Sequence, residues 1–137
     1  MGDRGNIEIV QGVKRMNEDE VRALDSVFLY THWRGSQVAQ ILASALEKSG
    51  IRGGDPSYLT RIIFNELQGD DRTTTGFGIS VGHPDDNEYA IPKVIWQRVD
   101  SANRAEGSNE LRILYNGRDY SPDEFIAEYA NTEVVVV

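Results

Sequence analysis

Two consecutive amphipathic patterns, at residues 36–50 and 55–67, constrain the fold of this chain more than any other feature. In "SQVAQILASALEKSG" the apolar residues recur at i, i+3, i+4, i+7 and i+8, which is one face of a helix: Val38, Ile41, Leu42, Ala45 and Leu46. Ser36 is the expected N-cap of this helix, and Gly50 is the expected glycine just beyond its end.

The second pattern, "DPSYLTRIIFNEL", follows after the glycine-rich link "GIRGGD". Asp55 is the expected cap, and Pro56 occupies the first helical position, where its missing N–H costs nothing. The apolar stripe consists of Leu59, Ile62, Ile63 and Leu67. Each helix therefore has one apolar face to bury.

Alternating or β-branched runs predict strands at 6–10, 26–33, 76–82, 89–99 and 111–115, whereas 14–25 is charged and is assigned to the surface. We expect 76–82 and 89–99 to form a hairpin around the turn "HPDDNE", with Pro92 at a sheet edge or bulge because it cannot donate to a ladder. "NG" at 116–117 predicts a tight turn. A capping box of Ser121 and Glu124 starts a last helix in "SPDEFIAEYAN".

Because the helices are grouped between hairpin-type strands, the predicted fold class is α+β. The prediction is a mainly antiparallel sheet packed against two to three helices, in the order β-β-α-α-β-β-β-α, as a single domain over residues 1–137. The apolar tail "TEVVVV" (132–137) either adds an edge strand or meets another subunit, which makes a homo-oligomer the expectation.

Composition narrows the function classes. With 22 acidic and 14 basic residues the formal net charge is -8, which argues against direct nucleic-acid binding and against docking on an anionic membrane. The acidity serves either solubility or attraction to a basic partner. The chain has no cysteine, so thiol chemistry is excluded. The start "MGDRGNIEIV" lacks a long apolar run, which predicts a cytoplasmic location.

Catalytic signatures are absent from the sequence. The two histidines, His32 and His83, lie in no hydrolase or phosphoesterase motif, and no phosphate-binding glycine loop opens a helix. "HPDDNE" offers oxygen ligands for a hard cation, but its composition is that of a solvated turn. We therefore expect no catalytic residue, no metal and no cofactor, and the enzyme question stays open, with a non-enzyme favoured.

The densest patch of chemistry is "LYTHWRGSQV" (29–38). A helix N-terminus with Arg34 beside it suits a phosphate, and Trp33 or Tyr30 offers a face on which a base can stack. The alternative is structural, because strand alternation sends Tyr30 and His32 to one face and Trp33 to the other, and one of these faces belongs to the core.

Other candidate contacts lie further along the chain. Arg61 interrupts the second helix close to its apolar stripe and either snorkels or contacts a ligand. In "RTTTGFG" (72–78) the hydroxyls of Thr73 to Thr75, followed by Phe77, either bond a phosphate or ribose or simply cap a turn. The candidate ligand-binding residues are thus Arg34, Trp33, Tyr30, Arg61, Thr75, His32, Arg4 and Phe77.

Five blocks carry a resemblance: "GDRGNI" (2–7), "LYTHWRG" (29–35), "DPSYLTRIIFNEL" (55–67), "TTTGFGIS" (73–80) and "DNEY" (86–89). Together they resemble small accessory proteins encoded by tailed phages and prophages. The resemblance implies a setting, the cytoplasm of an infected host, and a role in countering host immunity by sequestering a nucleotide signal or occluding a host protein. It implies no catalytic residue.

Three hypotheses follow. The first is a protein that binds and sequesters a nucleotide messenger without cleaving it, with Arg34 and Arg61 on phosphate and Trp33 or Tyr30 on the base. The second is an acidic inhibitor of a host defence or nucleic-acid-binding protein, using the clusters at 17–20, 70–71 and 85–88. The third is a hydrolase of a cyclic or dinucleotide signal, with His32 as general base.

Overall fold

The structure, a computed structural model, describes residues 2–10, 13–17, 20–23, 26–69, 76–98 and 109–130. The strands in these ranges are β1 (Gly5–Val10), β2 (Val13–Asn17), β3 (Glu20–Ala23), β4 (Ser26–Thr31), β5 (Phe77–Val81), β6 (Lys93–Arg98), β7 (Asn109–Tyr115) and β8 (Arg118–Tyr120). The helices are α1 (Val38–Ser49), α2 (Pro56–Gln68) and α3 (Pro122–Tyr129), and two short 3-10 helices, η1 (Gly35–Gln37) and η2 (Gly50–Gly54), precede α1 and α2.

The main sheet has the strand order β5-β4-β1-β6-β7-β8. All its pairings are antiparallel except that of β1 with β6, which is parallel. The predicted α+β class is confirmed, and the order β-β-α-α-β-β-β-α matches the chain order of β1, β4, α1, α2, β5, β6, β7 and α3.

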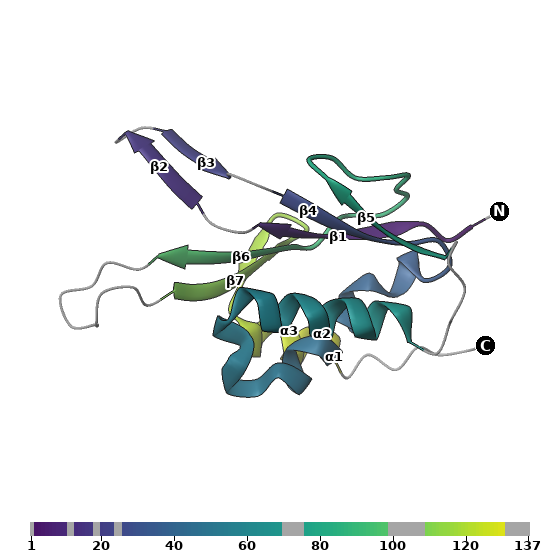
Figure 1. The fold of residues 1–137 in the computed structure, drawn as a ribbon. Coiled ribbons are helices and arrows are strands. Elements are labelled where there is room, and N and C mark those ends of the chain that lie inside the picture. Colours follow the sequence, from purple (N-terminus) through teal and green to yellow (C-terminus); the bar gives the residue numbers. More distant parts are fainter. Residues whose placement is uncertain are drawn as a thin grey trace.

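The three helices cover one face of this sheet (Figure 1). Alternate residues of the strands, such as Ile7, Leu29 and Val94, point into this helix-covered face and are almost fully buried. From α2 the residues Leu59, Ile63 and Leu67 enter the same core. Full burial of one such side chain contributes about 1.5–3 kcal/mol, so this layer is the main source of stability.

Two of the predicted helix ends are confirmed. Asp55 caps α2 by accepting a hydrogen bond from the backbone N–H of Tyr58 (3.2 Å), with Pro56 at the first position. Ser121 and Glu124 form the predicted capping box of α3. At the "NG" turn both residues have positive φ, 51° and 76°, as the tight hairpin between β7 and β8 requires.

The predicted N-cap of the first helix is wrong. Ser36 lies inside η1, and no side-chain cap hydrogen bond is present at either Arg34 or Gln37, the residues that precede η1 and α1. The predicted strand 26–33 also ends early, at Thr31.

The predicted hairpin between 76–82 and 89–99 is wrong as well. β5 pairs with β4 at the sheet edge, whereas β6 lies between β1 and β7 in the middle of the sheet. The connection 82–92 therefore passes over β4 and β1, on the face opposite to the helices (Figure 1). Two strand patterns that follow each other in the sequence favour a hairpin. Here β6 instead pairs in parallel with β1, so the chain has to cross from β5, at the edge, to the far side of β1.

Pro92 is neither at an edge nor in a bulge. It precedes the central strand β6, and its carbonyl accepts a hydrogen bond from the backbone N–H of Glu8 (2.8 Å). The missing donor thus lies just outside the ladder.

Residues 14–25, assigned to the surface, contain the strands β2 and β3, which pair as a separate hairpin beyond the main sheet (Figure 1). The tail 132–137 lies outside the described residues. No helix of the described residues is long and apolar enough to cross a membrane.

Candidate functional site at the start of helix α1

The turn from β4 into α1 is built around a close approach of two backbones. A Cβ on Gly35 would lie 2.5 Å from the carbonyl carbon of Arg4, and one on Gly5 would lie 2.7 Å from the Cα of Gly35. The N-terminal segment is hydrogen-bonded along this turn, from the N–H of Asp3 to the carbonyl of His32 (2.8 Å) and from the N–H of Gly35 to the carbonyl of Asp3 (2.7 Å). Glycine is therefore required at both crossing positions.

Asp3 occupies the helix N-terminus that the sequence offered to an anion. Its carboxylate accepts hydrogen bonds from the backbone N–H of Ser36 (3.1 Å) and from the Ser36 hydroxyl (2.6 Å). Partial burial raises the pKa of Asp3, but the hydrogen bonds from Ser36 and Tyr89 outweigh burial and hold this pKa below its ordinary value. The chain thus supplies its own anion here, a residue that sequence reasoning did not single out.

Arg34 reaches from the start of α1 to the C-terminus of α2, which lies beside it. Its Nη1 donates to the carbonyl oxygens of Glu66 (2.9 Å) and Leu67 (3.1 Å), in the last turn of α2. These carbonyls have no partner within the helix, so Arg34 caps the C-terminus of α2. Among the described residues no carboxylate forms an ion pair with it.

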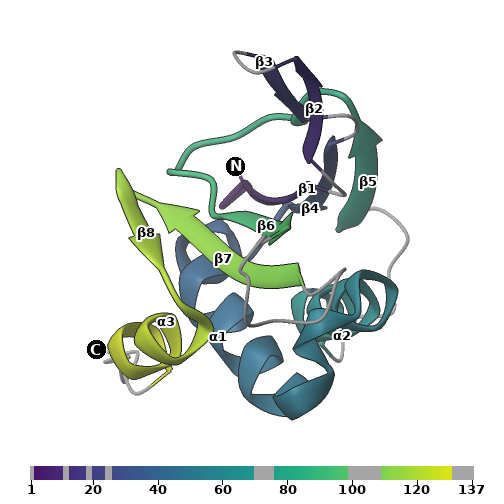
Figure 2. The ribbon, with the colours of Figure 1, turned by 90° about the vertical axis from the view of Figure 1, so that its left-hand side faces the viewer.

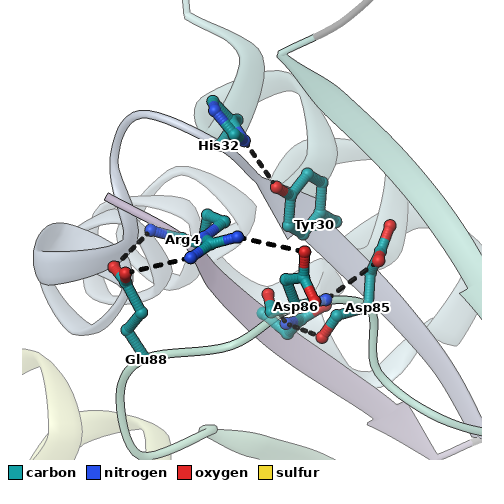
Figure 3. A network of polar contacts seen from close by, with 7 residues as sticks. Arg4, Tyr30, His32, Asp85, Asp86 and Glu88 are labelled. Atoms are coloured by element: carbon teal, nitrogen blue, oxygen red, sulfur yellow. Dashed lines mark hydrogen bonds and ion pairs between the residues drawn. The ribbon is translucent and has the colours of Figure 1, made fainter. Parts of the chain in front are cut away.

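The aromatic residues of this turn divide between interior and surface. Tyr30 is buried on the face that the 82–92 connection crosses, and its hydroxyl bonds to Nδ1 of His32 (2.7 Å; Figure 3). Trp33 is 55% exposed, and its ring meets that of His32 edge-on at a centroid distance of 4.4 Å. Of the two rings proposed for stacking, Trp33 is the one that solvent reaches. Burial, with Asp85 nearby, raises the pKa of Tyr30.

Arg4 faces the acidic loop instead of the exposed ring. Its guanidinium bonds to Asp86 (3.0 Å) and Glu88 (3.4 Å), and its backbone N–H donates to Glu88 (3.0 Å), as Figure 3 shows. The hydrogen bond to Glu88 raises the pKa of Arg4. Of the "HPDDNE" acids, Asp86 and Glu88 are thus neutralised internally by Arg4.

Asn6 holds the loop at 85–87 on the sheet, a role that sequence reasoning missed. It is fully buried, and its Nδ2 donates to Oδ1 of Asn87 (3.1 Å) and toward the carbonyls of Asp85 and Asp86 (3.4 Å each). The available signal was a polar residue opening an otherwise apolar strand, at a position that alternation assigns to the face opposite Ile7.

The remaining candidates are placed as follows. Phe77 is half-buried against the core, and Arg61 lies on the exposed side of α2 with its guanidinium 5.8 Å from the ring of Tyr58, so it does not join the turn. Thr75, like Thr73 and Thr74, lies outside the described residues. The ends of that segment are at the turn, because Gly69 lies beside Arg34 Nη1 and the carbonyl of Gly76 accepts from the N–H of His32 (2.9 Å).

The structure thus gathers Tyr30, His32, Trp33 and Arg34 at one corner of the sheet, named here the β4–α1 corner, with Arg4 beside it and Arg61 elsewhere. In the described ranges no group of three or more His, Asp or Glu side chains is arranged to hold a metal ion. The fold and the corner define an α+β protein with a polar, aromatic corner where strand β4 ends and leads toward α1. Comparisons of the chain with protein families, with curated proteins and with solved structures find no match.

Proposed function

We propose that this protein binds a nucleotide-like anion at the β4–α1 corner and retains it without cleaving it. The observation that carries the proposal is the exposed indole of Trp33 next to Arg34, a cation that no carboxylate of the described residues neutralises. An exposed ring can stack on a base, and a guanidinium can pair with a phosphate. In the setting that the phage resemblance implies, retention of a host signalling nucleotide would counter host immunity.

The roles within the proposed site differ from those expected from the sequence. The N-terminus of η1, which leads into α1, is not used for phosphate, since Asp3 occupies it. Nη1 of Arg34 donates to the carbonyls at the end of α2, and its remaining N–H groups donate to the ligand. His32 orients the indole through its edge-on contact, while its Nδ1 stays bonded to Tyr30.

The test is calorimetric titration with a panel of mononucleotides, dinucleotides and cyclic dinucleotides. We expect one class to bind, and Arg34→Gln to weaken binding about tenfold or more, as loss of a charged contact to phosphate does. Arg61→Gln is the matched control, because it removes the same charge from a position outside the corner. Equal weakening by both variants, or binding of none of the three classes of nucleotide, would overturn the proposal.

Tryptophan fluorescence locates the site. The chain has two tryptophans, and Trp96 is only 3% exposed while Trp33 is 55% exposed. A bound base should therefore quench the emission of the wild type, and Trp33→Phe should abolish the quenching. Quenching that persists in Trp33→Phe would place the ligand elsewhere.

Chromatography of the ligand after long incubation separates retention from hydrolysis. We expect intact nucleotide with both the wild type and His32→Ala. Product that forms with the wild type and disappears with His32→Ala would instead support the hydrolase hypothesis, with His32 as general base.

A further inference from the structure

A cleft of about 650 Å³ opens at the opposite end of α1 from the β4–α1 corner. Its walls come from the end of α1, from η2, from the start of β7 and from the first turns of α3. Figure 2 shows α3 beside α1 under β7, an arrangement that agrees with the packing of α3 on both elements. The volume is within the range of roughly 300–1,000 Å³ that is usual for ligand pockets.

The lining of this cleft has an apolar floor and an acidic rim. Leu46, Leu111 and Ile126 provide the apolar surface, and Glu47, Glu110 and Asp123 provide carboxylates. No lysine or arginine of the described part of the chain lines the cleft. Arg112 bonds to Glu110 (3.3 Å) and Asp119 (2.8 Å), so within the described ranges one of the three rim acids, Glu110, is paired with a cation.

The helix end adds to the negative potential. The C-terminus of α1 carries a partial negative charge, and its last-turn lysine, Lys48, bonds to Glu66 of α2 instead of covering that end. The wall at η2 is made partly of glycines, and a Cβ on Gly50 or Gly54 would meet no atom within 4 Å. The opening therefore carries little side-chain bulk.

We propose that this cleft binds a basic segment of a partner protein. A lysine or arginine of that segment lays its methylene stem on the apolar floor and places its charge among the rim carboxylates, as amphipathic cationic side chains do at apolar surfaces. The charge complementarity favours this occupant over a neutral peptide or an anion. The cleft is separate from the β4–α1 corner, so this proposal does not depend on whether the corner binds a nucleotide.

The probe is the acetylated, amidated peptide Ala-Arg-Leu-Arg-Ala, with Ala-Glu-Leu-Glu-Ala as its charge-reversed control. In NMR titrations the basic peptide should shift the backbone amides of Gly50, Gly53, Gly54 and Leu111, and the acidic peptide should shift none of them. Absence of any shift up to about 1 mM peptide would overturn the proposal.

Two double variants separate a site from general attraction to an acidic protein. Glu47→Gln with Asp123→Asn removes two rim charges, and Asp85→Asn with Glu128→Gln removes two charges away from the cleft lining. We expect the rim variant to weaken the peptide about tenfold and the control variant less than about twofold. Equal losses would mean that only net charge attracts the peptide, and the proposal would be wrong.

A third variant tests the shape of the cleft. Gly54→Leu adds bulk at the wall: a Cβ at this position would meet no atom within 4 Å, and Gly54 is not among the glycines with positive φ, so the backbone tolerates a side chain there. We expect it to weaken the basic peptide while thermal unfolding stays at the wild-type temperature. Unchanged affinity in both Gly54→Leu and the rim variant would exclude this cleft as the binding site.

Discussion

The two ends of helix α1 differ in how closely the rest of the chain packs against them. At its start, Asp3 from the N-terminal segment accepts hydrogen bonds from Ser36, and the backbones of Arg4 and Gly35 are in direct contact. At its end, glycines with open space around them border a cleft in which Glu47 and Asp123 have no cation of the described residues against them. The start of α1 is thus held by residues distant in the sequence, whereas its end borders an open cleft.

This difference shows that a charged residue in a suggestive position is not necessarily a ligand contact. Arg34 was a candidate ligand contact because an arginine beside a helix N-terminus suits phosphate, and Arg4 because it lies in a block of the phage resemblance. Both bond within the chain, Arg4 to carboxylates and Arg34 to helix carbonyls. Internal bonds of this kind stabilise the fold first and serve binding only through the donors that remain. Mutations at the two ends of α1 should therefore differ in their effect on stability.

The largest difference is expected between two glycine-to-alanine changes. In Gly35→Ala the new Cβ lies 2.5 Å from a backbone carbon, so the N-terminal segment must move, and we expect a loss of about 2–3 kcal/mol. In Gly54→Ala the Cβ meets nothing, and the change should be neutral or slightly stabilising, because it restricts the unfolded chain. Urea unfolding of the two variants measures this difference in stability. Similar midpoints would contradict the close backbone packing at Gly35 and the open space at Gly54.

A smaller difference is expected between Arg34→Gln and Glu47→Gln. Loss of the charged donor leaves the carbonyls of Glu66 and Leu67 without their partner, which should cost about 1.5–3 kcal/mol. Glu47 is exposed, so its neutralisation should leave thermal unfolding unchanged. Arg34→Lys keeps the positive charge and shows how much of the loss depends on charge alone. If Arg34→Gln unfolded at the same temperature as Glu47→Gln, Arg34 would not stabilise the end of α2.

What the sequence could predict follows from how local each feature is. The helix α2 was readable because Asp55, Pro56 and the stripe of Leu59, Ile63 and Leu67 act within one segment. The parallel pairing of β1 with β6 was not, because it joins residues more than eighty positions apart and leaves no local trace.

The candidate site shows the same limit. The pattern around Trp33 and Arg34 was visible, since those residues are consecutive, and their gathering with Tyr30 and His32 follows from the strand end. The roles of Asp3 and Asn6 were invisible, because each depends on a partner from another element: Ser36 for the first and the loop at 85–87 for the second. The cleft was invisible for the same reason, as its walls come from four separate elements.

The smallest effect tests the carboxylate that completes the start of α1. Removing the hydrogen-bond acceptor in Asp3→Ala should cost about 1 kcal/mol at neutral pH, as loss of a helix N-cap does, and Asp3→Asn should cost less because an amide oxygen still accepts. The pKa of Asp3 in the folded protein lies below its ordinary value of 3.8. Its charge therefore stabilises the fold above that value, and this contribution is lost as the pH falls through the folded-state pKa.

The free energies of unfolding of the wild type and Asp3→Asn should accordingly differ at pH 7 and converge as the pH falls through the lowered folded-state pKa of Asp3. Asp3→Ala should remain less stable than both at every pH, because it lacks the acceptor itself. Wild-type and Asp3→Asn curves that stay parallel across this range would mean that the charge of Asp3 does not act on α1. The two ends of the helix would then differ in packing alone, and the negative charge of Asp3 would have no part in how the chain holds the start of α1 in place.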